Sequence, residues 1–269
     1  LYYKKNYCYL TSSVKRGRFP IELVNQKHPN ILKIKEHKSQ KIITFPTTLT
    51  IELAEFLGYL MGDGNIRPQY LQISNEDSEI INRVKELSKL IFNIEPIIKK
   101  VKGTENLYDI RICSKTLVNL FSIFNLKPGK KGKELKIPEE ILLSDNETVR
   151  AFARAYFDCD SSPSYNHRQI ELTSESHILI EQINVLLKRF CIISTISKKI
   201  VDKIPYWRLM IRSKSAEKYA DKIGFLIARK QDRANKFKDY GLIQGSGKED
   251  MIPLGRLLKE IRLANGFSI

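Results

Sequence analysis

The stretch 56-FLGYLMGDGN-65 returns in altered form as 153-ARAYFDCDSS-162. Both regions carry small residues four positions apart, namely Gly58, Gly62, Ala151, Ala155 and Cys159. Residues at this spacing share one face of a helix, where small side chains let two helix backbones pack closely. Each stretch then reaches an acid, Asp63 or Asp160. The pattern predicts two helices packed side by side, with two carboxylates converging at one end of the seam.

The sequence around these stretches is duplicated. Residues 71–96 resemble residues 170–195, and residues 110–133 resemble residues 209–232, at a constant offset of 99 positions. Ser114 therefore corresponds to Ser213, and Lys131 to Lys230. In each copy the apolar periodicity predicts the order helix, strand, strand, helix, strand, strand, helix. For the first copy we expect helices near 50–62, 77–92 and 115–124, and strands near 66–74, 96–102 and 107–113. The second copy is expected from about 147 to 223.

Composition shifts divide the chain into five segments. We expect a basic N-terminal extension over 1–47, a first unit over 48–126 and a second unit over 147–240. A linker over 127–146 carries the turn residues Pro128, Gly129 and Pro138. The last segment, 241–269, holds a Gly-Ser-Gly stretch and a short helical pattern near 254–264.

The chain is strongly basic, with a net charge of +16 and a pI of about 9.6. Residues 1–50 contain ten lysines and arginines, and their only acids are Glu22 and Glu36. A basic protein of this kind favours a polyanionic partner, because neutralised phosphates release counterions. The alternative is a lysine-rich solvated surface of the kind that thermophile proteins carry. The charge thus suggests nucleic acid without deciding for it.

Several classes of protein are disfavoured. No apolar run approaches the roughly 20 residues that a membrane span needs, so we expect no membrane partner. The four cysteines follow neither a metal-finger nor a disulfide spacing, which suggests free thiols in a reducing, cytoplasmic setting.

The paired acids suggest a metal site. Two carboxylates brought together repel each other unless a cation lies between them, and Mg²⁺ accepts one or two carboxylates together with phosphate and water. An aspartate before Gly64 can also be an ordinary turn residue, and paired glycines can be plain helix packing. The occurrence of both features at matching places in a duplicated unit favours the metal site.

These residues resemble the paired motifs of single-chain LAGLIDADG homing endonucleases over roughly residues 48–240. The stretches 128-PGKKGKELKIPEEI, 223-IGFLIARKQD and 251-MIP especially resemble endonucleases embedded in archaeal inteins. The resemblance implies an α+β fold of two pseudo-twofold-related αββαββα units. Their motif helices would form the interface, and two antiparallel sheets would form a saddle over double-stranded DNA.

The resemblance also implies roles for particular residues. Asp63 and Asp160 would hold Mg²⁺ or Mn²⁺, assisted by the carbonyls of Gly62 and Cys159. Such metals would activate water and stabilise the leaving oxygen, and two acids would serve two strands, giving a staggered break. Lys131 and Lys230 would either hold the attacking water or screen the charge that develops on the phosphate. Lys130 competes with Lys131 for this role, and either lysine could be a solvated or phosphate-contacting residue.

The second motif departs from the family pattern at two positions. Ser161 replaces the closing glycine, which puts efficiency at the second site in question, and Ala155 stands at the third position. Asp158 is a second acid beside Asp160. Because residues two apart on a helix face differently, we expect Asp158 to have a structural or capping role.

Strand alternation predicts the side chains that face DNA. An ordinary solvated sheet face would show the same polarity, so this prediction relies on the resemblance. The expected set is Tyr70, Gln72, Ser74, Lys100, Lys102, Asp109 and Arg111 in the first unit, and Gln169, Glu171, Thr173, Lys199, Arg208, Met210 and Arg212 in the second.

Two questions stay open at this point. Residues 1–47 fit either an extra DNA-binding arm or the tail of a neighbouring module. The chain starts at Leu1, which is not a splicing nucleophile, and ends in Gly-Phe-Ser-Ile, so we expect an excised or internal endonuclease portion. The duplicated unit further predicts a monomer with internal pseudo-twofold symmetry. The rival interpretation is a catalytically silent nucleic-acid-binding protein of the same fold, such as an RNA maturase or a regulator. Retention of both acids speaks against it.

Overall fold

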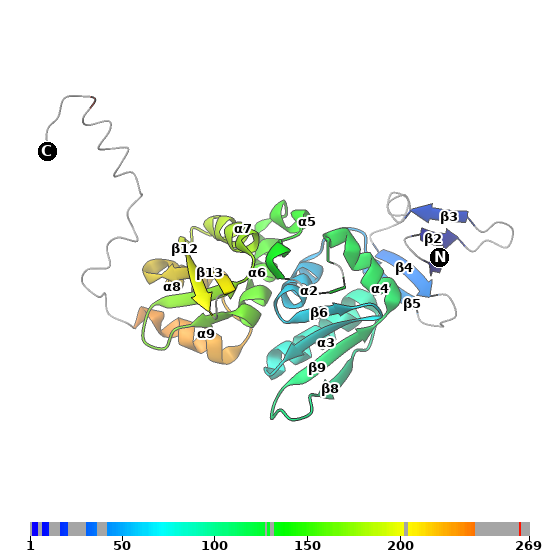
Figure 1. Ribbon diagram of the computed structural model, residues 1–269, viewed down its shortest axis with the longest axis horizontal. Helices are drawn as coiled ribbons and strands as arrows, with labels where there is room; N and C mark the ends of the chain where they lie inside the picture. The colour runs from blue at the N-terminus through cyan, green and yellow to red at the C-terminus, as the bar shows by residue number, and fades with distance from the viewer. Residues whose placement is uncertain are drawn as a thin grey trace.

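In the computed structural model, helices α2 (Ile51–Gly62) and α6 (Asn146–Asp160) lie against each other between two similar units (Figure 1). Thr50 caps α2, since its hydroxyl accepts a hydrogen bond from the Leu53 N–H at 3.2 Å. Asp145 caps α6 by accepting from the Thr148 N–H at 2.8 Å. Residues Leu53–Met61 of α2 are all buried, as expected for a helix covered on every side.

The seam between these helices is built on its small residues. A Cβ atom at Gly58 would lie 2.6 Å from the carbonyl oxygen of Phe152 and 2.7 Å from the Cβ of Ala155. A Cβ at Gly62 would lie 2.4 Å from the Cβ of Cys159. The two helices therefore meet almost backbone to backbone, as the spacing of small residues predicts.

Each unit contains the predicted order of elements. The first continues from α2 through β6 (Gly64–Arg67), β7 (Tyr70–Asn75), α3 (Ser78–Phe92), β8 (Ile97–Lys100), β9 (Tyr108–Cys113), α4 (Lys115–Leu120) and a 3₁₀ turn, η1 (Phe121–Phe124). The second continues from α6 through β10 (Ser161–Pro163), β11 (Gln169–Ser174), α7 (His177–Lys188), β12 (Ser194–Val201), β13 (Ile204–Arg212) and α8 (Ser213–Lys222).

The two sheets have the same strand order, β6-β7-β9-β8 and β10-β11-β13-β12, and all their pairings are antiparallel. The α+β fold of two αββαββα units is thus confirmed. The structure describes residues 2–4, 7–10, 17–20, 31–36, 42–126, 128–129, 132–201, 204–239 and 264. The helical pattern expected near 254–264 lies almost wholly outside them.

Four short elements join or follow the units. The linker contains η2 (Gly132–Glu134) and α5 (Glu139–Leu142). The linker is fastened to α7, because the Gln182 side chain accepts from the Ile137 N–H at 2.8 Å and the Ser176 hydroxyl donates to the Leu135 carbonyl at 2.5 Å. After α8 come α9 (Ala228–Asn235) and η3 (Lys236–Lys238).

A third sheet precedes the first unit, in a region for which the sequence analysis proposed no strands. Its order is β3-β2-β1-β4-β5, formed by β1 (Tyr2–Lys4), β2 (Tyr7–Leu10), β3 (Gly17–Pro20), β4 (Ile31–Glu36) and β5 (Ile42–Pro46). Strand β5 packs onto the first unit: the Phe45 ring lies 6.1 Å from that of Phe92, and the Thr44 hydroxyl donates to the Ile91 carbonyl at 2.6 Å. Strand β5 therefore shares the core of the first unit. The functional role predicted for residues 1–47 stays a prediction.

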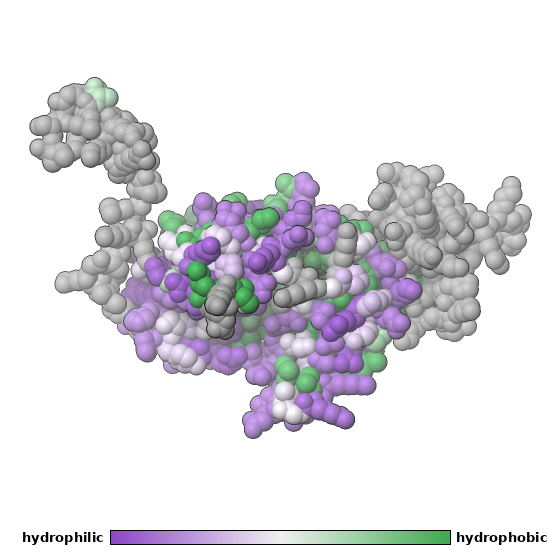
Figure 2. Space-filling view, in the orientation of Figure 1, coloured by the Kyte–Doolittle hydropathy of each residue, from purple (hydrophilic) through white to green (hydrophobic). Residues whose placement is uncertain are grey.

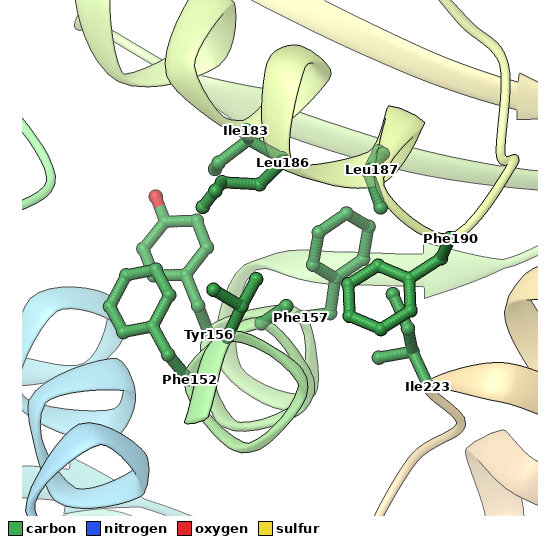
Figure 3. A pocket seen from close by; sticks show the side chains of 10 residues that line it. Phe152, Tyr156, Phe157, Ile183, Leu186, Leu187, Phe190 and Ile223 are labelled. Atoms are coloured by element: carbon green, nitrogen blue, oxygen red, sulfur yellow. The ribbon is translucent and has the colours of Figure 1, made fainter. Parts of the chain in front are cut away.

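The core of the second unit lies between α6 and α7. Figure 3 shows Phe152, Tyr156 and Phe157 of α6 facing Ile183 and Leu187 of α7 around a small gap. All the residues that line this gap are aliphatic or aromatic. We therefore regard the gap as imperfect core packing.

The outer surface of the two units is mainly hydrophilic on the face drawn in Figure 2. Within the part of the chain that the structure describes, no helix has the length and apolar character needed to cross a membrane.

Candidate metal centre and DNA-facing sheets

The two motif acids lie at the same end of the helix seam. Asp63 caps the C-terminal end of α2, where its N–H donates to the Tyr59 carbonyl at 3.1 Å, and Asp160 is the last residue of α6. Both line one cleft, together with Gly62 and residues of β7 and β11. A Cβ placed on Gly62 would lie 3.8 Å from Oδ2 of Asp160, so Asp160 reaches the end of α2. Asp63 in turn is hydrogen-bonded to the side chain of Cys159 in α6. The predicted convergence of the carboxylates is present.

Different partners hold the two carboxylates. Oδ2 of Asp63 accepts a hydrogen bond from Nδ2 of Asn75 at 2.6 Å. The buried hydroxyl of Tyr156 donates to the carboxylate of Asp160. Burial raises the pKa of Tyr156 well above its ordinary value, and the negative charge of Asp160 raises it further. This phenol therefore remains a hydrogen-bond donor at neutral pH.

Cys159 lies between the two acids. Burial raises the pKa of its thiol well above the usual range, and the charges of Asp63 and Asp160 add to the effect. The side chain is also hydrogen-bonded to Asp63. The thiol is therefore neutral, and the backbone carbonyl of Cys159 is the better candidate ligand for a hard cation.

The donor set fits a hard divalent ion. Two carboxylates and the carbonyls of Gly62 and Cys159 offer only oxygen atoms, which are the ligands that Mg²⁺ and Mn²⁺ prefer. Among the residues that the structure describes, no group of three His, Cys, Asp or Glu side chains could hold a metal alone. Such a site needs further oxygens from water or phosphate, which Mg²⁺ normally keeps.

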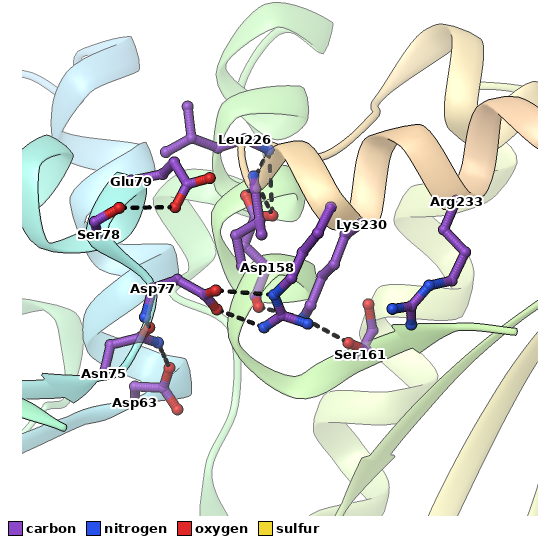
Figure 4. A network of polar contacts seen from close by, with 12 residues as sticks. Asp63, Asn75, Asp77, Ser78, Glu79, Asp158, Ser161, Leu226, Lys230 and Arg233 are labelled. Carbon is purple, nitrogen blue, oxygen red and sulfur yellow. Dashed lines mark hydrogen bonds and ion pairs between the residues drawn. The ribbon is translucent and has the colours of Figure 1, made fainter. Parts of the chain in front are cut away.

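Lys230 of α9 is only 7% exposed and lies beside the end of α6 (Figure 4). Its Nζ donates to the carbonyl of Asp158 at 2.5 Å and to the carbonyl of Ser161 at 2.7 Å. Burial lowers the pKa of this lysine. The ammonium thus binds the backbone on both sides of Asp160. Lys131, the residue predicted to be its counterpart, lies outside the described residues, as does Lys130.

Asp158 turns away from the motif acids. Its buried carboxylate accepts from the N–H groups of Leu226 at 3.0 Å and Ile227 at 3.3 Å, immediately before α9. Burial raises the pKa of Asp158 to about 6 although these two hydrogen bonds oppose the shift. The predicted structural, capping role is confirmed. Ser161 caps its own helix, since its hydroxyl donates to the Phe157 carbonyl at 2.7 Å.

The structure adds site residues that the sequence analysis did not identify. Asn75 and Tyr156 contact the acids directly. Arg229 donates to both carboxylate oxygens of Asp77 at 2.9 and 2.7 Å, which connects α9 of the second unit to the start of α3 in the first. The only signal in the sequence was the inward register of Asn75 in its strand, and that register indicates burial rather than contact with Asp63.

The outer face of the first sheet carries polar residues in the predicted register. Gln72 pairs with Arg111, and Ser74 with Asp109. The Ser74 hydroxyl donates to Asp109 at 2.7 Å, Arg111 donates to Asp109 at 2.8 Å, and the Arg111 guanidinium lies over the ring of Tyr70. Burial works against ionisation of Asp109, but these hydrogen bonds together lower its pKa. The face is therefore an ordered polar network.

One lysine prediction on this sheet needs correction. Lys100 pairs with Tyr108, two positions from the buried Ile110, so it lies in the register of the inner face. Lys99, opposite Asp109, occupies the outer face instead. The cause is the two-residue period of a strand, in which a shift of one position changes the face. Lys102 is exposed in the turn after β8.

The second sheet repeats this arrangement. Gln169, Glu171 and Thr173 pair with Arg212, Met210 and Arg208, and Lys199 pairs with Tyr206. Met210 needs a second correction, because it is only 6% exposed and an Arg212 nitrogen lies 3.2 Å from its sulfur. Met210 lies on the predicted face of the sheet, but neighbouring side chains bury it. Arg212, rather than Met210, presents the accessible polar group there.

The comparisons with known proteins agree with this architecture. The model of the LAGLIDADG-like domain matches residues 50–122 and again residues 147–224, which are the two repeated units. These matches cover more than half of the chain. The chain belongs to the LAGLIDADG homing-endonuclease family, in the form with two motif units.

Particular relatives extend the comparison. I-DmoI in complex with DNA and Ca shares the fold with a TM-score of 0.50 and 17% identity, and the match covers 68% of this chain and 95% of that one. An A-type ATP synthase subunit of Pyrococcus abyssi is 34% identical over 85% of this chain and 21% of its own length. A probable translation initiation factor IF-2 of Methanocaldococcus jannaschii is 32% identical over 86% of this chain and 20% of its own length. The chain spans about a fifth of the length of these curated relatives.

Proposed function

We propose that this chain is a site-specific DNA endonuclease that makes a metal-dependent, staggered double-strand break in a long target. The observation that carries the proposal is the pair of acids, Asp63 and Asp160, at the converging ends of two helices that line one cleft. A protein that only binds nucleic acid has no need of this repulsive pair. The two related units would give each DNA strand its own carboxylate within one monomer.

The residues around the cleft have separable roles in this proposal. A divalent ion held by Asp63 and Asp160, with the carbonyls of Gly62 and Cys159, would supply Lewis acidity toward the scissile phosphates. Asn75 and Tyr156 orient the two carboxylates. Lys230 fixes the backbone on both sides of Asp160 and places a buried positive charge near the phosphate.

The outer faces of the two sheets are the proposed DNA-reading surfaces. Arginine and amide side chains there can pair with base edges in the major groove, while exposed lysines contact phosphates. The corrected contact set replaces Lys100 with Lys99 and leaves Met210 beneath Arg212. The net charge of +16 supports the affinity that such contacts require.

We further propose that the chain is the endonuclease portion of an archaeal intein. The archaeal proteins that it matches bear unrelated names, including an ATP synthase subunit, an initiation factor and a small subunit of replication factor C. In each, the match covers about a quarter of the protein or less. A shared segment inside unrelated proteins suits an inserted element, and the target would then be the uninterrupted host sequence.

The experiment is a cleavage assay with duplexes that carry uninterrupted host junctions, supplemented by a randomised duplex library, in Mg²⁺ or Mn²⁺. We expect Asp63→Asn and Asp160→Asn to abolish double-strand cleavage and to preserve DNA binding in a mobility-shift assay. Asp232→Asn, at an exposed acid of α9, is the matched control and should cleave normally. Full cleavage by the double variant would refute the assignment. Binding without any cleavage by the parent chain would favour the silent, DNA-binding alternative.

A further inference from the structure

We infer that Arg229 is a positioning residue that sets the carboxylate of Asp63 from the opposite unit, acting through Asp77 and Asn75. This inference rests on the proposed function, because it assigns a cross-unit control to one of the two proposed metal ligands. Figure 4 shows Asp77, Asn75 and Asp63 in sequence, next to α9.

The chain of contacts is continuous. Arg229 donates to both oxygens of Asp77, at 2.9 and 2.7 Å. The N–H of Asp77 donates to Oδ1 of Asn75 at 2.7 Å, and Nδ2 of Asn75 donates to Oδ2 of Asp63 at 2.6 Å. Three interactions therefore connect a helix at the end of the second unit to the first acid.

The donor and the acceptor of the Asn75 amide fix the orientation of this side chain. A side-chain amide has one acceptor atom and one donor group. Because Oδ1 of Asn75 is taken by the Asp77 N–H, the amide presents its donor to Asp63. Asn75 is only 9% exposed, so little room remains for another orientation. A paired, planar guanidinium fixes the Asp77 side chain more tightly than a single point charge would.

The second unit has a counterpart of this chain, but it starts from the linker and not from Arg229. At the repeat offset, Ser174 replaces Asn75 and Ser176 replaces Asp77. The Ser176 hydroxyl donates to the Leu135 carbonyl of the linker, and the Ser176 N–H donates to Oγ of Ser174 at 3.2 Å. The Tyr156 side chain is hydrogen-bonded to both Ser174 and Asp160. Among the described contacts, those that start at Arg229 therefore lead to Asp63. Loss of Arg229 should lower the affinity for the metal at Asp63 and leave the affinity for the metal at Asp160 unchanged.

The experiment measures Mn²⁺ affinity by electron paramagnetic resonance, on complexes with the cleaved target duplex, in two backgrounds. Asp160→Asn leaves only the Asp63 side to be measured, and Asp63→Asn leaves only the Asp160 side. Both backgrounds are blocked in double-strand cleavage, so the readout does not depend on turnover.

In the Asp160→Asn background we expect Asn75→Ala to weaken Mn²⁺ binding about 10-fold, the lower end of the range for residues that orient metal ligands. Arg229→Gln, one step further away, should weaken it about threefold, and Arg229→Lys should restore part of the loss. In the Asp63→Asn background neither change should alter affinity. The control is Arg233→Gln on the same helix, whose side chain contacts Pro163 and Tyr165 of the second unit.

Equal effects of Arg229→Gln in both backgrounds, or no effect in either, would overturn the inference. A lowered unfolding temperature with unchanged Mn²⁺ affinity would also overturn it, because Arg229 would then only stabilise the contact between units. If the parent chain cleaves no duplex, the proposed function fails and the inference fails with it. If the parent cleaves and Asp63→Asn does not, a negative result for Asn75 and Arg229 rejects the inference alone.

Discussion

Replacement of Gly58 by alanine tests whether the backbone contact between α2 and α6 is essential for stability. The added Cβ would lie 2.6 Å from the Phe152 carbonyl oxygen and 2.7 Å from the Ala155 Cβ, and real Cβ atoms essentially never approach within 3.0 Å. The helices would have to move apart. Overpacking of a tight core costs about 1–3 kcal/mol. Alanine in place of a helical glycine recovers roughly 1 kcal/mol of helix propensity.

The clash should prevail, because one of the two contacts is a backbone atom that no rotamer change can move. The cost should therefore lie in the upper part of that range, at about 2–3 kcal/mol. After the gain in propensity we expect a net loss of about 1–2 kcal/mol, equivalent to about 2–8 °C in unfolding temperature for a chain of this size. Thermal and urea unfolding of the metal-free protein provide the measurement. The second variant, Gly58→Ala with Ala155→Gly, should recover only part of the loss, since the Phe152 carbonyl remains. An unchanged or raised unfolding temperature for Gly58→Ala would show that the two helices can accommodate the added Cβ. The helix propensity of alanine would then outweigh the steric cost.

Three further predictions follow from single contacts. Phe45→Ala should lower the free energy of unfolding of the first unit by about 3–5 kcal/mol, because the ring is 4% exposed and lies against Phe92 and Phe121. The control is Ile42→Ala, at an exposed position of the same strand. Equal effects of the two changes would contradict the shared core. Asp145→Ala should lower stability at neutral pH. Hydrogen bonds from the N–H and the side chain of Thr148 lower the pKa of Asp145. Its contribution is therefore present above the unfolded-state pKa and is lost as the pH falls through the folded-state pKa. A difference between variant and parent that persists unchanged into strong acid would argue against this cap. Arg212→Ala should weaken cleavage at one half-site by roughly 10-fold, in line with about 1–3 kcal/mol for a good base contact; an unchanged site preference in a library selection would exclude base reading by Arg212.

Much of the fold could be predicted because its signals are local or repeated. Helical periodicity places α3 within a residue of Ser78–Phe92, and a constant offset of 99 positions relates the two units in the sequence itself. The contact between α2 and α6 could also be predicted, since small residues four positions apart lie on one face of a helix. The outer sheet faces followed from alternation wherever buried residues set the phase, as Leu71 and Ile73 do.

The errors arose where the sequence did not indicate the face on which a strand residue lies, or where a contact joins residues far apart in the chain. Lys100 was assigned to the wrong face because β8 has no buried residue to set its register, as all four of its residues are exposed. Met210 was assigned to the correct face, but alternation cannot show that a neighbouring arginine covers a side chain. The pairing of Arg229 with Asp77 joins residues 152 positions apart, beyond the reach of any local pattern. Strand β5 was not predicted, because it packs against Phe92 and Phe121 of the first unit, which are distant in sequence.

The position of α9 has a consequence for the order in which the protein is made. Both acids belong to helices that leave the ribosome before α9, yet the backbone around Asp160 is bound by Lys230, and Asn75 is oriented through Arg229. A nascent chain that has completed both sheets still lacks these contacts. The candidate metal centre is therefore completed late in synthesis, so in the proposed endonuclease a partly synthesised chain still lacks the finished centre.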